Sequence, residues 1–498
     1  MRKMIDIGKT RQLMWDDTLV DKNENVEIRL HNPQRQNIAF VADAPWERVY
    51  FCYLSLVKVG EKFRLYYRSQ GMTTDHDQNL EENYTKEQKA ELHKGVICVI
   101  ESDDGINFYR PKVGQYEMLG SYDNNIVFMS DEYIDSFSVY YDENPDCPDD
   151  ERFKALFFPY IEGQPLSLHY YKSRDGYSFE FVRVLDIYGA FDTLNTLTYD
   201  TEKKKYRLYL RSFHMEDGSD FDVNDEVLRA QAFRDIRTCE SEDMVHWTKP
   251  KRLTYDDGED NLQLYTNGIK KYHRGDVFIG LPTRYNDRRD DIHNCKYLPN
   301  PGGVREEVMA RNIRFGTAVT DCVFMHSADG YYFCRSQEGF ITPGLENGKN
   351  WFYGDCYVAW GVAETASVYD GEPNELSFYA GVGKGGIGKM MLTRYTLRLD
   401  GFYSWNAKKS GGSVLTKPFK FDGNKLSVNF KTSAFGSLRI KICDENGKAI
   451  EGYDSRNLFG DSVDRPVDFE KDLSALSGKN VRLEIFLSDC DLYSFIFQ

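Results

Sequence analysis

Residues 102–108 read Ser-Asp-Asp-Gly-Ile-Asn-Phe, and the phrase returns as Ser-Arg-Asp-Gly-Tyr-Ser-Phe at 173–179, Ser-Glu-Asp-Met-Val-His-Trp at 241–247 and Ser-Ala-Asp-Gly-Tyr-Tyr-Phe at 327–333. A shorter copy, Leu-Asp-Gly-Phe-Tyr at 399–403, ends the series. Asp-Gly followed by an aromatic residue is typical of a hairpin turn, because glycine accepts positive φ and the aromatic residue begins the next strand. Recurrence of the phrase at roughly 70 to 90 residues is the signature of a repeat architecture. Five copies predict a five-bladed β-propeller.

The segments between the turns support four strands in each blade. In the first unit, apolar and aromatic runs at 51–57, 63–68 and 95–100 precede the turn, and a fourth strand follows it. Four-stranded blades around a central channel are the propeller plan. The later units are expected at about 125–188, 190–255, 264–342 and 355–408. After a Gly/Ser break at 408–413, short alternating strands predict a β-sandwich. The expected fold is therefore all-β, with a five-bladed β-propeller at 1–408 and a C-terminal β-sandwich at 409–498.

Composition and charge narrow the classes of partner. The net charge is −16, whereas a nucleic-acid-binding protein needs a basic footprint. The same charge argues against docking on anionic lipid, and the sequence has neither an apolar stretch long enough to span a membrane nor a signal-peptide pattern at its start. The ten cysteines are scattered singly and suit small buried residues in a reducing compartment. We expect a cytoplasmic protein that needs no metal and no cofactor.

Loop lengths indicate where a site would lie. The connections between second and third strands are long in three blades, at about 69–94, 213–235 and 285–315. In an up-and-down blade these connections share a rim with the start of the innermost strand. Long loops on a rigid scaffold are commonly functional. They are expected to shape a substrate site at this mouth of the channel, and contact between copies in a homo-oligomer is the alternative.

Acidic residues near the starts of the innermost strands are the candidates for chemistry. Glycoside cleavage needs two carboxyl groups, one protonated and one ionised, and several carboxylates in a confined mouth can divide these roles. Trp46 beside Glu47 adds a flat apolar face suited to a sugar ring. The candidates at blade starts are Asp43, Glu47, Asp131, Asp135, Asp192, Asn267 and Glu364, with Asp321 on a third strand and Asp16 and Asp17 on an N-terminal strand that would close the ring.

Arginines recur at matching places. Arg68, Arg211 and Arg284 each end a second strand near the same rim. A guanidinium binds a carboxylate or phosphate through its planar fork. Two interpretations stay open: an ion pair to a neighbouring acid, or contact with an anionic sugar or phosphate.

Five phrases carry a resemblance to a known group of enzymes. They are Trp-Asp-Asp-Thr-Leu-Val at 15–20, Asp-Ala-Pro-Trp-Glu at 43–47, Asp-Asn-Asn-Ile-Val at 123–127, Leu-Arg-Leu-Asp-Gly-Phe at 397–402 and Asp-Leu-Tyr-Ser-Phe at 491–495. With them the chain resembles the five-bladed propeller glycosidases of families 32, 43, 68 and 130, and within these an uncharacterised bacterial family-32-like group. The resemblance implies a glycan site at the channel mouth. The invertase-type Trp-Met-Asn-Asp-Pro-Asn-Gly, Arg-Asp-Pro and Glu-Cys motifs are absent, so that family's nucleophile and acid are not carried over.

The hypothesis is a glycoside hydrolase acting on a small oligosaccharide or glycoside. Its carboxylate set is Glu47, Asp135 and Asp192. The residues expected to bind substrate are Asp17, Asp43, Trp46, Arg68, Arg211, Asn267, Arg284, Asp321 and Glu364. The alternatives are a glycoside phosphorylase, which the arginines and the intracellular location favour, and a non-catalytic glycan-binding propeller.

Overall fold

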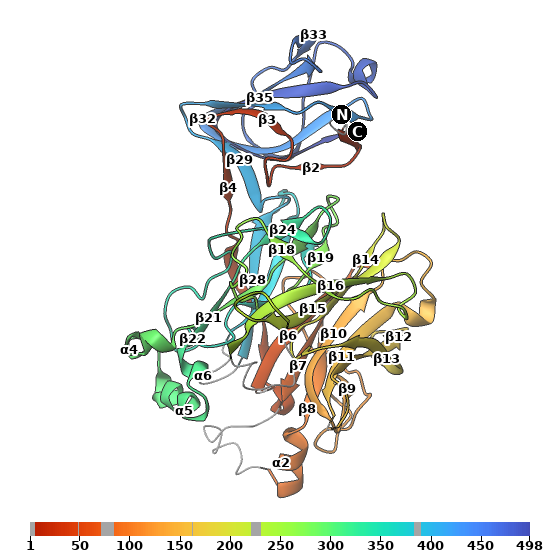
Figure 1. Cartoon of the computed structure of the whole chain (residues 1–498), viewed down its shortest axis with the longest axis vertical. Helices are drawn as coiled ribbons and strands as arrows, with labels where there is room; N and C mark the ends of the chain where they lie inside the picture. The colour runs from red at the N-terminus through yellow and green to blue at the C-terminus, as the bar shows by residue number, and fades with distance from the viewer. Residues whose placement is uncertain (1–4, 48, 71–83, 162, 221–230, 383–389) are drawn as a thin grey trace.

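The computed structural model describes residues 5–47, 49–70, 84–161, 163–220, 231–382 and 390–498. Its lower part in Figure 1 is a ring of five β-sheet blades, and its upper part is a second β domain that holds both termini. The predicted five-bladed propeller with a C-terminal β domain is confirmed.

The first three blades have the expected four antiparallel strands. Blade one consists of β6 (Val49–Val59), β7 (Lys62–Gln70), β8 (Gly95–Ser102) and β9 (Ile126–Met129). Blade two consists of β10 (Tyr133–Tyr141), β11 (Phe153–Tyr160), β12 (Ser167–Ser173) and β13 (Glu180–Tyr188). Blade three consists of β14 (Thr196–Asp200), β15 (Lys205–His214), β16 (Phe233–Ser241) and β17 (Lys251–Arg252).

Blades four and five are less regular. Blade four consists of β19 (Lys270–Lys271), β20 (Phe278–Gly280), β23 (Met325–Ser327), β24 (Tyr332–Arg335) and β18 (Thr254–Tyr255), with β21 (Thr283–Asp287) pairing β22 (Ala318–Cys322). Blade five consists of β25 (Tyr357–Val358), β26 (Ala363–Thr365), β27 (Glu375–Val382), β28 (Met390–Arg398) and β5 (Gln34–Ala42). An N-terminal strand therefore closes the ring, but it is β5 and not the segment that holds Asp16 and Asp17.

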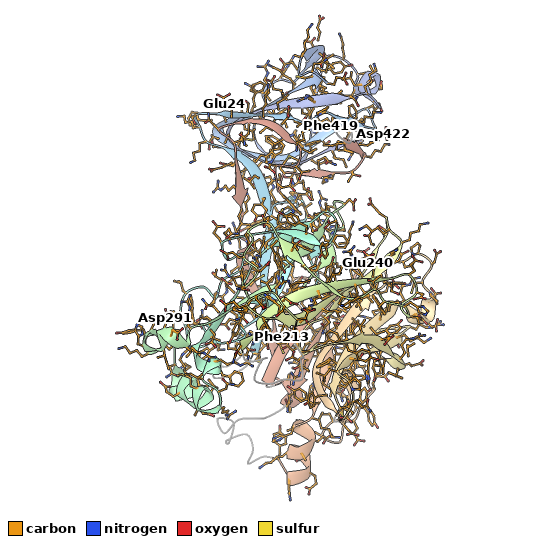
Figure 2. All side chains as sticks on the ribbon, in the orientation of Figure 1. Glu24, Phe213, Glu240, Asp291, Phe419 and Asp422 are labelled. Carbon is orange, nitrogen blue, oxygen red and sulfur yellow. The ribbon has the colours of Figure 1, made fainter. Side chains whose placement is uncertain are left out.

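The second domain is one sheet folded around a single apolar core. Two long strands organise it, β32 (Leu426–Asp444) and β35 (Val481–Phe497), where the sequence predicts short ones. The other strands are β1 (Ile5–Gly8), β2 (Gln12–Leu13), β3 (Val20–Glu24), β4 (Glu27–Leu30), β29 (Tyr403–Ala407), β30 (Gly412–Thr416), β31 (Phe419–Phe421), β33 (Ala449–Asp454) and β34 (Asp461–Pro466). Figure 2 places Phe419 and Asp422 in this domain and Phe213 in the propeller.

The first thirty residues differ from the expected domain division. The sequence-based boundary assigns residues 1–408 to the propeller, yet β1 to β4 pair with strands of the second sheet. Ile7, Met14 and Leu19 explain this placement, because their side chains are buried in the core of the second domain. β29 (Tyr403–Ala407) likewise pairs in the second sheet although it precedes residue 408, and the predicted division at 408 is not otherwise tested.

The repeated turns join neighbouring blades. In the second copy, Ser173 and Asp175 accept backbone N–H groups of the turn, and Gly176 has a φ of 77°. The carbonyl of Gly176 accepts a 2.9 Å hydrogen bond from the Tyr66 hydroxyl of blade one. Tyr209 does the same for Gly330 of the fourth copy, at 3.0 Å. The acids of these turns are therefore structural.

The helices lie on the rim that faces away from the second domain (Figure 1). They are α2 (Lys86–Leu92), α4 (Ile292–Cys295), α5 (Val304–Arg311) and α6 (Arg314–Thr317), all within the long second-to-third connections. Segments 71–83 and 221–230 of these connections fall outside the described residues. So does most of the Gly-Val-Gly-Lys-Gly-Gly stretch at 381–386, which the sequence predicts as a flexible second-to-third connection in blade five. No helix in the described ranges is long and apolar enough to cross a membrane.

Candidate functional site

Five tyrosines meet where the innermost strands begin. They come from blade one, blade four and the entry to blade five: Tyr53, Tyr265, Tyr285, Tyr353 and Tyr357. The ring centroids of Tyr265 lie 5.6 Å from Tyr357 and 5.8 Å from Tyr353, and those of Tyr53 and Tyr357 are 6.2 Å apart. Blades one and four are not neighbours in the ring, so their side chains converge at the central axis. We call this group the tyrosine cluster.

Tyr53 is turned inward by its backbone. It has a φ of 55° and lies at a register shift between Cys52 and Ser55 in β6. A bulge of this kind re-aims a side chain next to a functional surface. Burial, and then the nearby Tyr265 and Asp135, raise the pKa of Tyr53 well above its ordinary value. Tyr53 therefore stays a neutral hydroxyl within electrostatic reach of Asp135.

Three arginines stack on the aromatic rings of this mouth. The Arg211 guanidinium carbon lies 4.1 Å from the ring centroid of Phe213 and 5.4 Å from that of Tyr265. The Arg234 carbon lies 4.3 Å from Tyr285 and 5.3 Å from Tyr265. The third is Arg314, 5.5 Å from Tyr353. Stacking on a ring leaves the N–H edge of a guanidinium free to bind oxygen atoms.

Two predicted carboxylates border the cluster, each beside a predicted arginine. Asp192 forms an ion pair with Nη1 of Arg211, whose side chain is only 3% exposed. Asp135 Oδ1 lies 3.6 Å from Nη1 of Arg68, which is equally buried. The two acids come from the starts of blades two and three, which are neighbours. The structure thus brings Asp135, Asp192, Arg68 and Arg211 to the same mouth.

Glu47 lies in a different environment. Its side chain is fully buried, and its oxygens accept hydrogen bonds from Arg110, Tyr67 and Asn125. The backbone N–H of Ala44 donates a further bond to Glu47 Oε2 at 3.2 Å. With both oxygens occupied inside blade one, this carboxylate is not accessible to a substrate. Sequence alone does not show whether the side chain of an acid that precedes a strand faces the channel mouth or is buried inside the blade.

The neighbours of Glu47 belong to the same structural network. Asp43 Oδ1 lies 2.8 Å from Nη2 of Arg110, and Trp46 donates its indole N–H to Asn125 at 3.0 Å. The aromatic-and-acid pair at 46–47 therefore ties the entry of blade one to its outer strands. Trp46 and Glu47 thus make their hydrogen bonds within this network of blade one, and Asp43 shares Arg110 with Glu47.

Blade four holds three more predicted residues away from the mouth. Arg284 binds Asp321 through two hydrogen bonds of 2.9 and 2.6 Å across the β21–β22 pair. Asn267 is buried and donates to the carbonyls of Leu194 and Tyr209, so it joins blades three and four. Each of the three recurrent arginines thus has a carboxylate beside it: Asp135 for Arg68, Asp192 for Arg211 and Asp321 for Arg284.

Glu364 and Asp17 lie on the side of the second domain. Glu364 lines a cavity of about 910 Å³ together with Lys9 and Ile496 of that domain. His273 lies 3.0 Å from Glu364, and this hydrogen bond lowers the pKa of Glu364 to about 2. Asp17 is exposed between β2 and β3, and its carbonyl accepts the N–H of Val20. Neither acid joins Asp135 and Asp192.

The most informative residues of the mouth are ones the sequence reading passed over. Near the starts of the innermost strands, where the sequence analysis expects acids, lie Tyr265, Tyr353 and Tyr357. Arg234 and Arg314 come from the far ends of two long connections. An inspection of aromatic residues at blade starts would have found the tyrosines, whereas the convergence of the two arginines is visible only in three dimensions.

Comparison with known proteins gives a distant structural likeness. No protein-family model matches the chain, and no curated protein matches its sequence. An N-acetylgalactosamine deacetylase from F. plautii, solved with blood group B trisaccharide, aligns over 92% of this chain and 95% of its own, with 10% identity and a TM-score of 0.41. A structure from the GH130 family of mannoside phosphorylases, which contains glycoside hydrolases that target β-1,2 mannosidic linkages in Candida mannan, aligns over 74% and 94%, with 12% identity and a TM-score of 0.42.

A glycosyl hydrolase from Bacteroides ovatus gives a similar result, over 78% of this chain and 96% of its own, at 13% identity and a TM-score of 0.39. The structural neighbours are thus carbohydrate-active enzymes, but at these values the likeness carries no assignment of activity. The functional argument has to come from the mouth itself.

Proposed function

We propose that the chain is a carbohydrate-active enzyme that cleaves a glycosidic bond at the propeller mouth. The observation that carries this proposal is the placement of Asp135 and Asp192, each beside a buried arginine, around the tyrosine cluster. Aromatic faces bind the apolar faces of sugar rings, and a pair of carboxyl groups supplies the acid and the base or nucleophile of glycoside cleavage.

The two acids are assigned different roles from their contacts. Asp192 is held by its ion pair with the buried Arg211, and we assign it the role of base or nucleophile. Asp135 has a longer 3.6 Å contact to Arg68 and faces the Tyr53 side of the cluster, which suits the acid that protonates the leaving oxygen. Glu47 is not carried into this set, because its oxygens are occupied inside blade one.

A second activity, phosphorolysis, is favoured by Arg234 and Arg314. In that reaction the bond from the anomeric carbon to the glycosidic oxygen breaks, a phosphate oxygen bonds to the anomeric carbon, and the leaving oxygen takes a proton from Asp135. Two guanidiniums beside the cluster offer the charge and the donors that phosphate requires.

The experiment is incubation of the protein with oligosaccharides and aryl glycosides, with and without phosphate, followed by product analysis by mass. Free sugar in both conditions supports hydrolysis, and sugar phosphate supports phosphorolysis. D135N and D192N should each lower turnover by roughly 10²-fold or more, as expected on removal of a catalytic acid or base. D291N, at a half-exposed acid next to α4, is the matched control and should behave like wild type.

Two outcomes would reject the proposal. Full activity in both D135N and D192N would remove these acids from the reaction. Sugar affinity without any product from the wild-type protein would instead indicate a non-catalytic glycan-binding propeller. Melting temperatures of the variants, measured alongside, separate loss of activity from loss of fold.

A further inference from the structure

The mouth contains more positive than negative charge among the described residues. Arg68 and Arg211 have Asp135 and Asp192 beside them, and Asp287 is held by Arg289 through a 2.5 Å contact. Arg234 and Arg314, in contrast, form no ion pair with any carboxylate in the described part of the chain. This excess stands out in a protein whose net charge is −16.

Arg234 is held firmly, but no carboxylate of the described residues forms an ion pair with it. Its guanidinium lies against Tyr265 and Tyr285, and Nη1 donates a hydrogen bond to Oε1 of Gln263. Its Nε is buried and has no acceptor within the described ranges. A buried charged donor left without an acceptor is destabilising, so such groups in native proteins call for an explanation.

The positive charge of the neighbouring Arg211 makes the burial of a charged Arg234 still less favourable. Burial, and then the positive charge of Arg211, lower the pKa of Arg234. Arg314 approaches the same ring system from the other connection, with its guanidinium carbon 5.5 Å from the ring centroid of Tyr353, and Tyr353, Tyr265 and Tyr285 help to raise its pKa. Tyr285 and Tyr353 are 6.0 Å apart at their centroids. The two arginines therefore reach one aromatic surface from two loops, and an anion bound there would offset the repulsion between Arg234 and Arg211.

We propose that Arg234 and Arg314 bind an oxyanion of the ligand, a carboxylate or a phosphate, at the aromatic mouth. The planar fork of arginine offers parallel N–H donors to two oxygens of such a group, and Tyr265, Tyr285 and Tyr353 exclude water around it. The link to a sugar substrate rests on the proposed function. The oxyanion is either carried on the saccharide, as in a uronic acid or a sugar phosphate, or supplied as free phosphate.

Binding is tested first, without reference to turnover. D-glucuronate, inorganic phosphate and neutral D-glucose are titrated into the full chain by calorimetry. We expect at least one of the two anions to bind, and R234Q or R314Q to weaken that binding by roughly tenfold or more, the loss typical of a hydrogen bond to a charged group. R234K keeps the charge but removes the fork, and it should restore only part of the affinity.

The control is R439Q, which removes the same charge from an arginine paired with Asp454 in the second domain. It should bind like wild type. Equal anion affinity in wild type, R234Q and R314Q overturns the proposal, and so does the lack of binding of either anion up to its solubility limit. If R234Q does not fold, R314Q and R234K provide the same comparison.

Turnover then separates the two sources of the oxyanion. Cleavage of an aryl glucuronide, with no cleavage of the aryl glucoside, places the anion on the saccharide. Cleavage of a neutral glycoside only when phosphate is present makes phosphate the co-substrate. If anion binding depends on Arg234 but no glycoside is turned over, the oxyanion site is supported and the proposed enzymatic function is rejected. Turnover that requires Asp192 but neither Arg234 nor Arg314 supports the enzyme and rejects the oxyanion site.

Discussion

The guanidinium of Arg274 holds both oxygens of Asp400, with Nε 2.7 Å from Oδ1 and Nη2 3.2 Å from Oδ2. Arg274 follows the innermost strand of blade four, and Asp400 belongs to the last copy of the repeated turn, just before β29. Ser494 of the second domain donates to Asp400 at 2.8 Å, and Arg11 lies 3.6 Å away. One fully buried carboxylate therefore links the propeller to the second domain.

D400N should destabilise the protein by about 3 kcal/mol, because it leaves Arg274 and Arg11 with no buried counter-charge. Asparagine tolerates the φ of 61° at this position, so the effect comes from the lost charge and not from the backbone. The change in free energy of unfolding is measured by urea denaturation of wild type and D400N. The control D454N breaks a half-exposed ion pair with Arg439 and should change the free energy of unfolding by less than about 1 kcal/mol. Equal effects from the two variants would contradict the prediction.

G176A should destabilise the fold through the repeated turn. A Cβ at this position would lie 2.5 Å from the Tyr66 hydroxyl and 2.6 Å from the Phe153 ring, and the φ of 77° adds backbone strain. We expect a loss of roughly 2 to 4 kcal/mol in urea unfolding.

G371A is the matched control for that variant. Gly371 has a φ of 81°, but its Cβ would meet nothing within 4 Å. It should therefore show the backbone effect alone, about 1 kcal/mol. If G371A is as destabilising as G176A, the contact between blades is not the cause.

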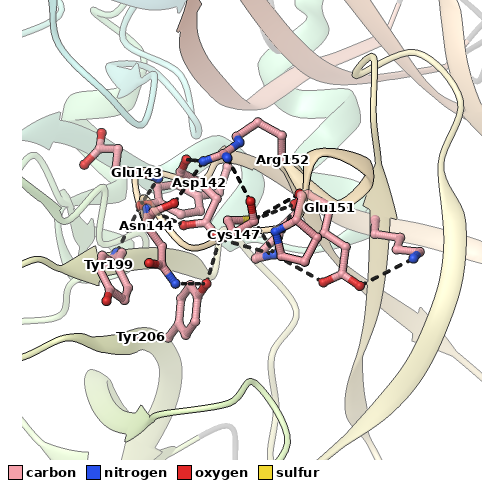
Figure 3. A network of polar contacts seen from close by, with 12 residues as sticks. Asp142, Glu143, Asn144, Cys147, Glu151, Arg152, Tyr199 and Tyr206 are labelled. Carbon is pink, nitrogen blue, oxygen red and sulfur yellow. Dashed lines mark hydrogen bonds and ion pairs between the residues drawn. The ribbon is translucent and has the colours of Figure 1, made fainter.

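K154M tests the polar network of blade two, which lies at the β10–β11 connection (Figure 3). Lys154 Nζ is 3.2 Å from Asp142 Oδ2, and both side chains are almost fully buried. Removal of the lysine leaves a buried carboxylate without its counter-charge, so we expect a loss of roughly 3 kcal/mol in urea unfolding. K172M, which breaks a more exposed pair with Asp150 in the same blade, should cost less than about 1 kcal/mol. A milder effect of K154M than of K172M would refute the assignment.

The fold was predictable from local sequence, whereas the site was predictable only in part, for a physical reason. Ser102, Asp104 and Gly105 make contacts within one turn, so their role can be read from local sequence. Glu47 and Asp192 look alike in sequence, since both are acids shortly before an innermost strand. Only the packing of Arg110 over one and the position of Arg211 beside the other distinguishes them.

Stability at acid pH should depend on Glu364. The hydrogen bond from His273 lowers its pKa in the folded state from an ordinary 4.5 to about 2. A lowered pKa means that the folded protein binds the proton less tightly than the unfolded chain. The stabilisation is therefore fully present above about pH 4.5 and is lost as the pH falls towards 2. Because the site is partly solvated, we expect at most about 1 kcal/mol at neutral pH.

The measurement is the difference in free energy of unfolding between wild type and E364Q, followed from neutral to acid pH. It should shrink as the pH falls below 4.5. E61Q, at an almost fully exposed glutamate, serves as the control and should differ little from wild type throughout. If the difference in free energy of unfolding between wild type and E364Q grew as the pH fell, it would contradict the lowered pKa of Glu364 in the folded state.

E47Q distinguishes a structural acid from a catalytic one. Glu47 receives hydrogen bonds from Arg110 at 2.9 and 3.1 Å and lies in a fully buried position, so neutralising it should destabilise the protein by roughly 3 kcal/mol. The part of the population that remains folded should keep the turnover of wild type, because Glu47 has no contact with the tyrosine cluster. D192N should show the opposite pattern, with turnover lost in protein that stays folded. Specific activity per folded molecule decides between them, and a loss of activity in fully folded E47Q would return Glu47 to the catalytic set.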